Sequence, residues 1–127
     1  MPPTVSESTR RALALGCRFF DEGRFFDAHE EWEAAWHLET GQVRQLLQGL
    51  IQVAAGFHKG LSQGRPSGMV RLLERGLGHI DSSGGLPLLD SRESFRDDVG
   101  RWLLAARRWA AGGDRPDLPL PRLGHGG

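Results

Sequence analysis

The stretch FFDAHEEWEAAW, residues 25–36, decides the fold of this chain. As an α-helix, with about 100° between successive residues, it gathers its aromatic side chains on one face. The sequence predicts that this face is buried and consists of Phe25, Phe26, His29, Trp32, Glu33 and Trp36. Because ionisable groups are costly to bury unless they are paired, the histidine and the glutamate must bind each other, their neighbours or a ligand.

Helical periodicity recurs along the rest of the chain, and strand patterns are scarce. We expect helices at residues 6–22, 25–37, 41–62, 66–80 and about 90–111, the last opening on an acidic variant of the capping box at Asp90 and Glu93. Because the connections are short, neighbouring helices should be antiparallel. The sequence therefore predicts an all-α fold, a single-domain antiparallel bundle of four to five helices with the second and third at its centre.

The domain is expected to span residues 1–111, and residues 112–127 are rich in glycine and proline. We predict that this last segment is a mobile tail, with the alternative that Leu118, Leu120 and Leu123 lie against the body of the protein.

Composition excludes several classes of function. Sixteen basic residues balance sixteen acidic ones in the 127-residue chain, so no overall field favours nucleic acid or an anionic membrane. The single cysteine, Cys17, cannot form an internal disulfide, which fits a reducing compartment. The first residues lack the pattern of a signal peptide, and no apolar run approaches the roughly 18 residues of a membrane span. We expect a cytoplasmic protein that binds neither nucleic acid nor membranes.

The pair formed by His29 and Glu33 has the spacing of a metal-binding helix. Side chains at positions i and i+4 converge, and the His-Glu-x-x-His zinc motif uses this spacing. Here a glutamate replaces the second histidine, and a carboxylate can also bind zinc, manganese or iron. A catalytic metal needs about three protein ligands, so His58 on the third helix is the candidate for the third, with Glu30 at the margin of the face. We expect no cofactor, and a divalent metal is the alternative.

A polar stripe on the third helix offers another partner for this pair. Gln48 and Gln52 lie one turn apart, opposite the apolar arc of the helix. The stripe is either a solvent face or a contact with another helix, which Gly49 and Gly56 would allow to come close. If that helix is the second, the glutamine amides would satisfy His29 and Glu33 without a metal. We predict that His29, Glu33, Gln48 and Gln52 form one contacting cluster.

The string over residues 25–36 and the later string LQGLIQVAA, residues 47–55, resemble the domain of unknown function 309 family. The resemblance covers about residues 12–80, and the family pattern matches at His29, Glu30, Glu33, Trp36, Gln48, Gly49 and Gln52. It implies a small all-helical bacterial or archaeal protein and brings no established activity.

Two hypotheses of function follow from these patterns. The first is a non-enzymatic interaction module, whose polar cluster of His29, Glu30, Glu33, Gln48 and Gln52 fixes helix register and whose surface binds another protein or a second copy of itself. The second is a metal-binding protein or metal-dependent hydrolase that uses the His-Glu-x-x-Glu helix. The sequence favours the first and leaves open whether the chain is an enzyme.

Overall fold

A computed structural model describes residues 5–84 and 92–123 of the chain. All regular structure in these residues is helical: α1 (Glu7–Asp21), α2 (Phe25–Trp36), α3 (Gly41–Phe57), the π-helical turn η1 (His58–Ser62), α4 (Pro66–Ser82) and α5 (Arg92–Ala110). The predicted all-α class is therefore confirmed. The capping residue expected at position 90 and the last four residues of the expected tail lie outside the described ranges.

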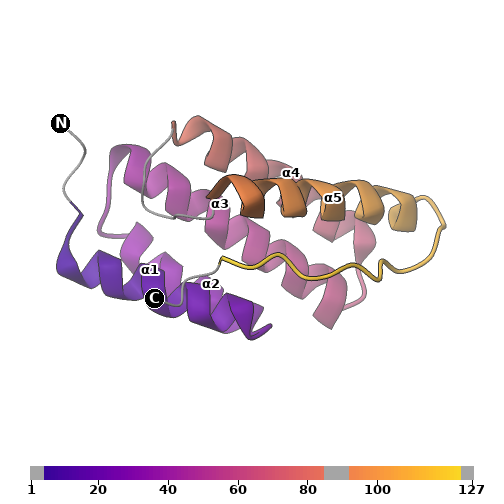
Figure 1. Cartoon of the computed structure of the whole chain (residues 1–127), viewed down its shortest axis with the longest axis horizontal. Coiled ribbons are helices and arrows are strands. Elements are labelled where there is room, and N and C mark those ends of the chain that lie inside the picture. The colour runs from indigo at the N-terminus through magenta and orange to yellow at the C-terminus, as the bar shows by residue number, and fades with distance from the viewer. Residues whose placement is uncertain (1–4, 85–91, 124–127) are drawn as a thin grey trace.

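The helices form two hairpins with a fifth helix alongside (Figure 1). One hairpin joins α1 to α2 through Gly23, which has a φ of 79° that favours glycine. The other joins α3 to α4 through η1 and Gly64, where φ is 67°. Helix α3 packs against both α2 and α4, and α5 packs against α4. The third helix is thus central, as its wide apolar arc predicts.

Aromatic rings from four helices meet in the core. The Phe20 ring of α1 lies 5.1 Å from that of Phe25, 5.8 Å from that of Phe57 and 5.5 Å from that of Phe95, measured between centroids. Trp32 of α2 is fully buried next to them, and its Nε1 donates a hydrogen bond of 3.2 Å to the carbonyl oxygen of Leu13. These contacts unite α1, α2, α3 and α5 around one hydrophobic centre.

Helices α3 and α4 touch through their backbones at Gly49 and Gly76. A Cβ atom on Gly49 would lie 2.8 Å from the carbonyl oxygen of Gly76, and one on Gly76 would lie 2.9 Å from that of Gly49. Only glycine fits at such a crossing. The prediction that Gly49 admits another helix is correct, but that helix is the fourth and not the second.

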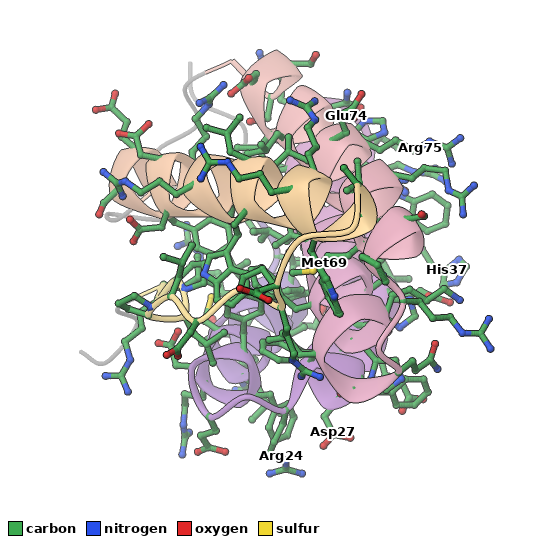
Figure 2. All side chains as sticks on the ribbon, turned by 90° about the vertical axis from the view of Figure 1, so that its right-hand side faces the viewer. Arg24, Asp27, His37, Met69, Glu74 and Arg75 are labelled. Atoms are coloured by element: carbon green, nitrogen blue, oxygen red, sulfur yellow. The ribbon has the colours of Figure 1, made fainter. Side chains whose placement is uncertain are left out.

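Side chains sort by polarity across the bundle, as Figure 2 shows for six labelled residues. Met69 of α4 is fully buried between the helices. The charged and polar side chains in the same view project outward, namely Arg24, Asp27, His37, Glu74 and Arg75.

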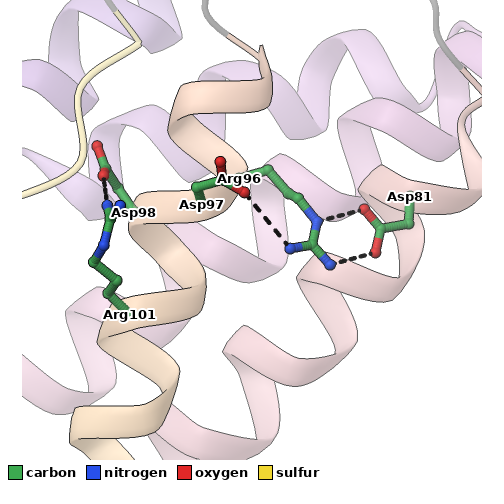
Figure 3. A network of polar contacts seen from close by, with 5 residues as sticks. All are labelled: Asp81, Arg96, Asp97, Asp98 and Arg101. Atoms are coloured by element: carbon green, nitrogen blue, oxygen red, sulfur yellow. Dashed lines mark hydrogen bonds and ion pairs between the residues drawn. The ribbon is translucent and has the colours of Figure 1, made fainter.

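An ion-pair network fastens the start of α5 to the end of α4 (Figure 3). The Arg96 guanidinium donates hydrogen bonds of 2.8 and 2.9 Å to the two carboxylate oxygens of Asp81. These hydrogen bonds, with the attraction of the Asp81 charge, raise the pKa of Arg96. Such bidentate geometry fixes direction as well as distance, so it ties the beginning of α5 to the end of α4.

The segment after α5 turns back and lies along the bundle (Figure 1). Trp102 Nε1 donates a hydrogen bond of 2.9 Å to the carbonyl oxygen of Pro119, and the Leu123 amide donates one of 2.8 Å to Asp21 Oδ1. Leu123 is buried, whereas Leu118 and Leu120 are exposed. Up to residue 123 the tail therefore lies against the helical bundle, which was the alternative to a mobile tail. These hydrogen bonds and the buried Leu123 side chain hold it there.

Candidate functional site

The buried face of α2 shares Phe25 and Trp32 with the predicted face but differs from it elsewhere. The residues that face the core are Phe25, Ala28, Trp32 and Ala35. Phe26 is 54% exposed, and the side chains of His29 and Glu33 are 28% and 46% exposed. The expectation that His29 and Glu33 lie at the centre of a buried face is therefore wrong. The helix is rotated by about one residue, because buried alanines avoid the cost of desolvating an imidazole and a carboxylate.

His29 and Glu33 bind each other along the flank of α2. His29 Nε2 lies 3.1 Å from Glu33 Oε2, and His37 Nε2 lies 3.9 Å from Glu33 Oε1. Glu30 is exposed beside them. The i, i+4 spacing thus brings the predicted pair together, and the carboxylate already has an imidazole partner.

Gln48 and Gln52 of α3 lie alongside the His29–Glu33 pair of α2. The ring of Phe26 lies 5.7 Å from that of His58, and the guanidinium of Arg44 lies 3.9 Å from the ring of Trp36. These contacts align α2 antiparallel to α3, so residues 48–52 run beside residues 29–33. Gln48 and Gln52 are half-buried there.

Two buried atoms of the predicted cluster have no hydrogen-bond partner. They are Nδ1 of His29 and Oε1 of Gln52. If the imidazole donates from Nε2 to the Glu33 carboxylate, both of these atoms are acceptors. Two acceptors cannot form a hydrogen bond with each other. The antiparallel alignment of α2 and α3 therefore places His29 and Gln52 at the same level, but the expected hydrogen-bonded network is not formed.

His58 is not brought to the His29–Glu33 pair as a third ligand. The Phe26 ring lies 6.0 Å from the His29 ring and 5.7 Å from the His58 ring, so it contacts both imidazoles. Within residues 5–84 and 92–123, no three or more histidine, cysteine, aspartate or glutamate side chains are grouped so that they could hold a metal ion.

A groove lies between α2, the junction of α3 with η1, and α4. Its volume is about 180 Å³. We call it the α2–α4 groove, and it is lined by Phe25, Phe26, His29, Ala55, His58, Lys59, Gln63 and Leu72. The half-exposed Phe26 forms one wall. An apolar hollow with a few convergent polar groups is the usual form of a small binding site.

The π-helical turn η1 shapes one side of this groove. The Gln63 amide donates a hydrogen bond of 3.2 Å to the carbonyl oxygen of His58, five residues earlier. On the inner side of the turn, Gly60 is buried against the Met69 side chain. The wider turn keeps His58, Lys59 and Gln63 together on the groove, and π-helical turns of this kind are frequent at functional sites.

Lys59 is the lining residue that the motif analysis missed as a site residue. It is the only lysine among the sixteen basic residues of the chain. Its aliphatic part lies across Gly68, where an added Cβ would be 2.7 Å from Cγ and 3.1 Å from Cε of the lysine. The sequence feature that could have identified Lys59 is that all the other residues among these sixteen are arginines.

The cysteine is not a nucleophile. Burial, together with the negative charge of Asp21, raises the pKa of the Cys17 thiol to about 12. The thiolate that reacts is therefore negligible at neutral pH. Among the described residues, the hydroxyl groups of Ser6, Ser8, Thr9 and Ser83 form hydrogen bonds with hydroxyl, carboxylate or carbonyl oxygens.

Fold and site together define an all-α bundle with a groove beside a His-Glu-x-x-Glu helix. Residues 13–72 match the model of a domain of unknown function, DUF309. The chain thus resembles this family, as the motifs indicate. Every residue that lines the α2–α4 groove falls within the matched range. A comparison with curated proteins gives no match.

Among the described residues, no helix has both the length and the apolar character needed to cross a membrane.

Proposed function

We propose that this protein is a non-enzymatic interaction module that recognises its ligand in the α2–α4 groove. The observation that carries the proposal is the composition of the groove wall. Phe26 keeps a large aromatic surface half exposed beside two imidazoles and an ammonium group, at the point where three helical segments meet. An aromatic ring costs free energy when it stays in water, so an exposed ring beside convergent polar groups favours binding.

The other exposed apolar side chains support this choice of surface. Leu38 follows α2, Leu104 lies on α5, and Leu118 and Leu120 lie on the tail. They belong to different parts of the bundle, and none of them lines the groove. Single exposed leucines are ordinary features of a protein surface. The groove is therefore the better candidate for recognition.

The ionisable groups support binding rather than catalysis. His29 Nε2 is directed at a carboxylate, and the Cys17 thiol is buried and protonated. A nucleophilic mechanism needs a hydroxyl or thiol within hydrogen-bond reach of a base. Among the described residues, the Thr9 hydroxyl donates a hydrogen bond to the Glu39 carboxylate, but Thr9 is fully buried and out of reach of a substrate.

Small one-ring probes test the proposal directly. We expect benzyl alcohol, benzylamine or benzoate, titrated into ¹⁵N-labelled protein, to shift the amide resonances of residues 25–29 and 55–63. Phe26→Ala should weaken binding of the effective probe by about tenfold, because the aromatic wall is lost. Leu38→Ala, which also removes an exposed apolar side chain but lies outside the groove, should leave the affinity unchanged. Shifts spread over the whole surface, or none, would contradict the proposal.

The metal-binding alternative rests on one contact, the 3.1 Å approach of His29 Nε2 to Glu33 Oε2. If this pair holds a divalent metal, elemental analysis of the purified chain should find stoichiometric metal, and His29→Ala should lose it. A His79→Ala variant, which removes a histidine from α4, is the control. Metal that stays bound in His29→Ala, or a metal-free protein after purification in zinc or manganese, would exclude this alternative.

A further inference from the structure

We propose that the α2–α4 groove takes a small organic carboxylate, with its charged end at the Lys59 ammonium and its apolar body against Phe26 and Leu72. The inference rests on the proposed function and names the class of ligand. It is drawn from the charge of the groove, the placement of the lysine and the size of the hollow.

The charge of the groove is of one sign. Its titratable lining residues are His29, His58 and Lys59, and no aspartate or glutamate lines it. A carboxylate entering the groove therefore meets no acidic lining residue, and the Glu33 carboxylate beside the lining His29 is already bound to Nε2 of that histidine at 3.1 Å. Hydrogen bonds between an ammonium group and a carboxylate are about twice as strong as neutral ones, so the groove favours an anion.

Among the described residues Lys59 has no ion-pair partner, which sets it apart from several, but not all, of the arginines. Arg24 pairs with Asp27, Arg96 with Asp81, and Arg107 with Glu74. Within the described residues, no carboxylate lies within ion-pair distance of the Lys59 ammonium. A cation that lies in an apolar hollow without a counter-charge is able to bind an anion that comes from outside.

The lysine side chain is also held in place. Gly68 leaves room for its methylene groups to lie flat against α4, since a Cβ there would come within 2.7 Å of Lys59 Cγ. The π-helical turn fixes its backbone, because the Lys59 carbonyl oxygen accepts a hydrogen bond of 3.0 Å from the Arg65 amide. A side chain that is already ordered loses less entropy when it binds a ligand. Lysine suits this position because its ammonium is compact, whereas a guanidinium is broad and planar.

The size of the groove restricts the ligand. A volume of about 180 Å³ is close to the ~150 Å³ cavity that holds benzene, and below the ~300–1,000 Å³ of sites for drug-sized ligands. The apolar body of the ligand is therefore one ring or a short branched chain.

Benzoate is the probe for this ligand class, with benzyl alcohol and benzylamine as its neutral and cationic counterparts. We expect benzoate to bind at least tenfold more tightly than either counterpart, measured by amide shifts of residues 25–29 and 55–63. Lys59→Met, which keeps an unbranched apolar side chain and removes the ammonium group, should abolish that preference and leave benzyl alcohol binding unchanged. Arg108→Met removes a cation from α5, none of whose residues lines the groove, and should retain the preference.

The outcomes separate this inference from the proposed function. Equal affinity for all three probes, or benzoate binding that survives in Lys59→Met, would overturn the carboxylate assignment and leave the groove as a binding site. Shifts caused by none of the probes would overturn both. An unchanged melting temperature in Lys59→Met, measured by circular dichroism, ensures that loss of preference is not loss of fold.

Discussion

Replacement of Trp32 by alanine is expected to lower the free energy of unfolding by about 3–5 kcal/mol. The indole is fully buried, contacts the Phe20 ring at 6.1 Å between centroids, and donates its N–H to the Leu13 carbonyl oxygen. Its removal leaves a cavity between α1 and α2 that the helices cannot fill by small shifts. Since small domains have only about 5–15 kcal/mol of stability, the effect should be visible in urea unfolding followed by circular dichroism.

Trp36→Ala provides the matched control on the same helix. Trp36 is half-buried at the edge of the core, and the Arg44 guanidinium lies 3.9 Å from its ring. Cation–π contacts at partly exposed positions contribute about 0.5–1 kcal/mol, so the loss should be much smaller than at Trp32. Equal losses in the two variants would mean that the core is not centred on Trp32.

The helical architecture could be predicted because it depends on local signals that repeat. Ser6 caps α1 by accepting a hydrogen bond from the Thr9 amide, and Pro66 occupies the first turn of α4. Both residues mark helix starts by rules that need no tertiary information. The π-helical turn at the end of α3 could not be predicted in this way, because its geometry depends on how Gly60 packs against Met69.

The orientation of α2 could not be settled from the sequence. Two faces compete, one through Phe26, His29 and Glu33 and the other, displaced by a single residue, through Phe25, Ala28 and Trp32. The aromatic content of the two faces does not decide which of them is buried. The second face is buried because alanine allows close helix packing and has no charge to desolvate, an advantage that depends on the neighbouring helices.

The candidate site could be predicted only in part, because it too depends on how the helices pack together. Motif spacing identified His29 and Glu33, which do bind each other. The groove itself is formed by residues up to 47 positions apart, from Phe25 to Leu72, and no local pattern joins them. Lys59 becomes a site candidate once the fold places it beside Phe26, Gly68 and His58.

The backbone contact between α3 and α4 leads to the second large effect, at Gly76. We expect Gly76→Val to lower the free energy of unfolding by about 3 kcal/mol, the upper end for an overpacked core. A Cβ at this position would lie 2.7 Å from Val53 Cγ2 and 2.9 Å from the Gly49 carbonyl oxygen. Backbone atoms cannot rotate away, so α3 and α4 must separate.

Gly78→Val separates this packing effect from the helix preference of the residue. Gly78 lies two residues further along α4, and a Cβ there would meet nothing within 4 Å. Valine and glycine differ little in helix propensity, so this variant should change the free energy of unfolding by no more than about 0.5 kcal/mol. The free energy of unfolding of both variants can be compared by thermal unfolding. A loss of free energy in Gly78→Val as large as that in Gly76→Val would show that helix propensity, and not the crossing of the helices, is the reason for glycine at position 76. Because Ala55 of α3 and Leu72 of α4 both line the groove, Gly76→Val should also weaken benzoate binding, whereas Gly78→Val should not.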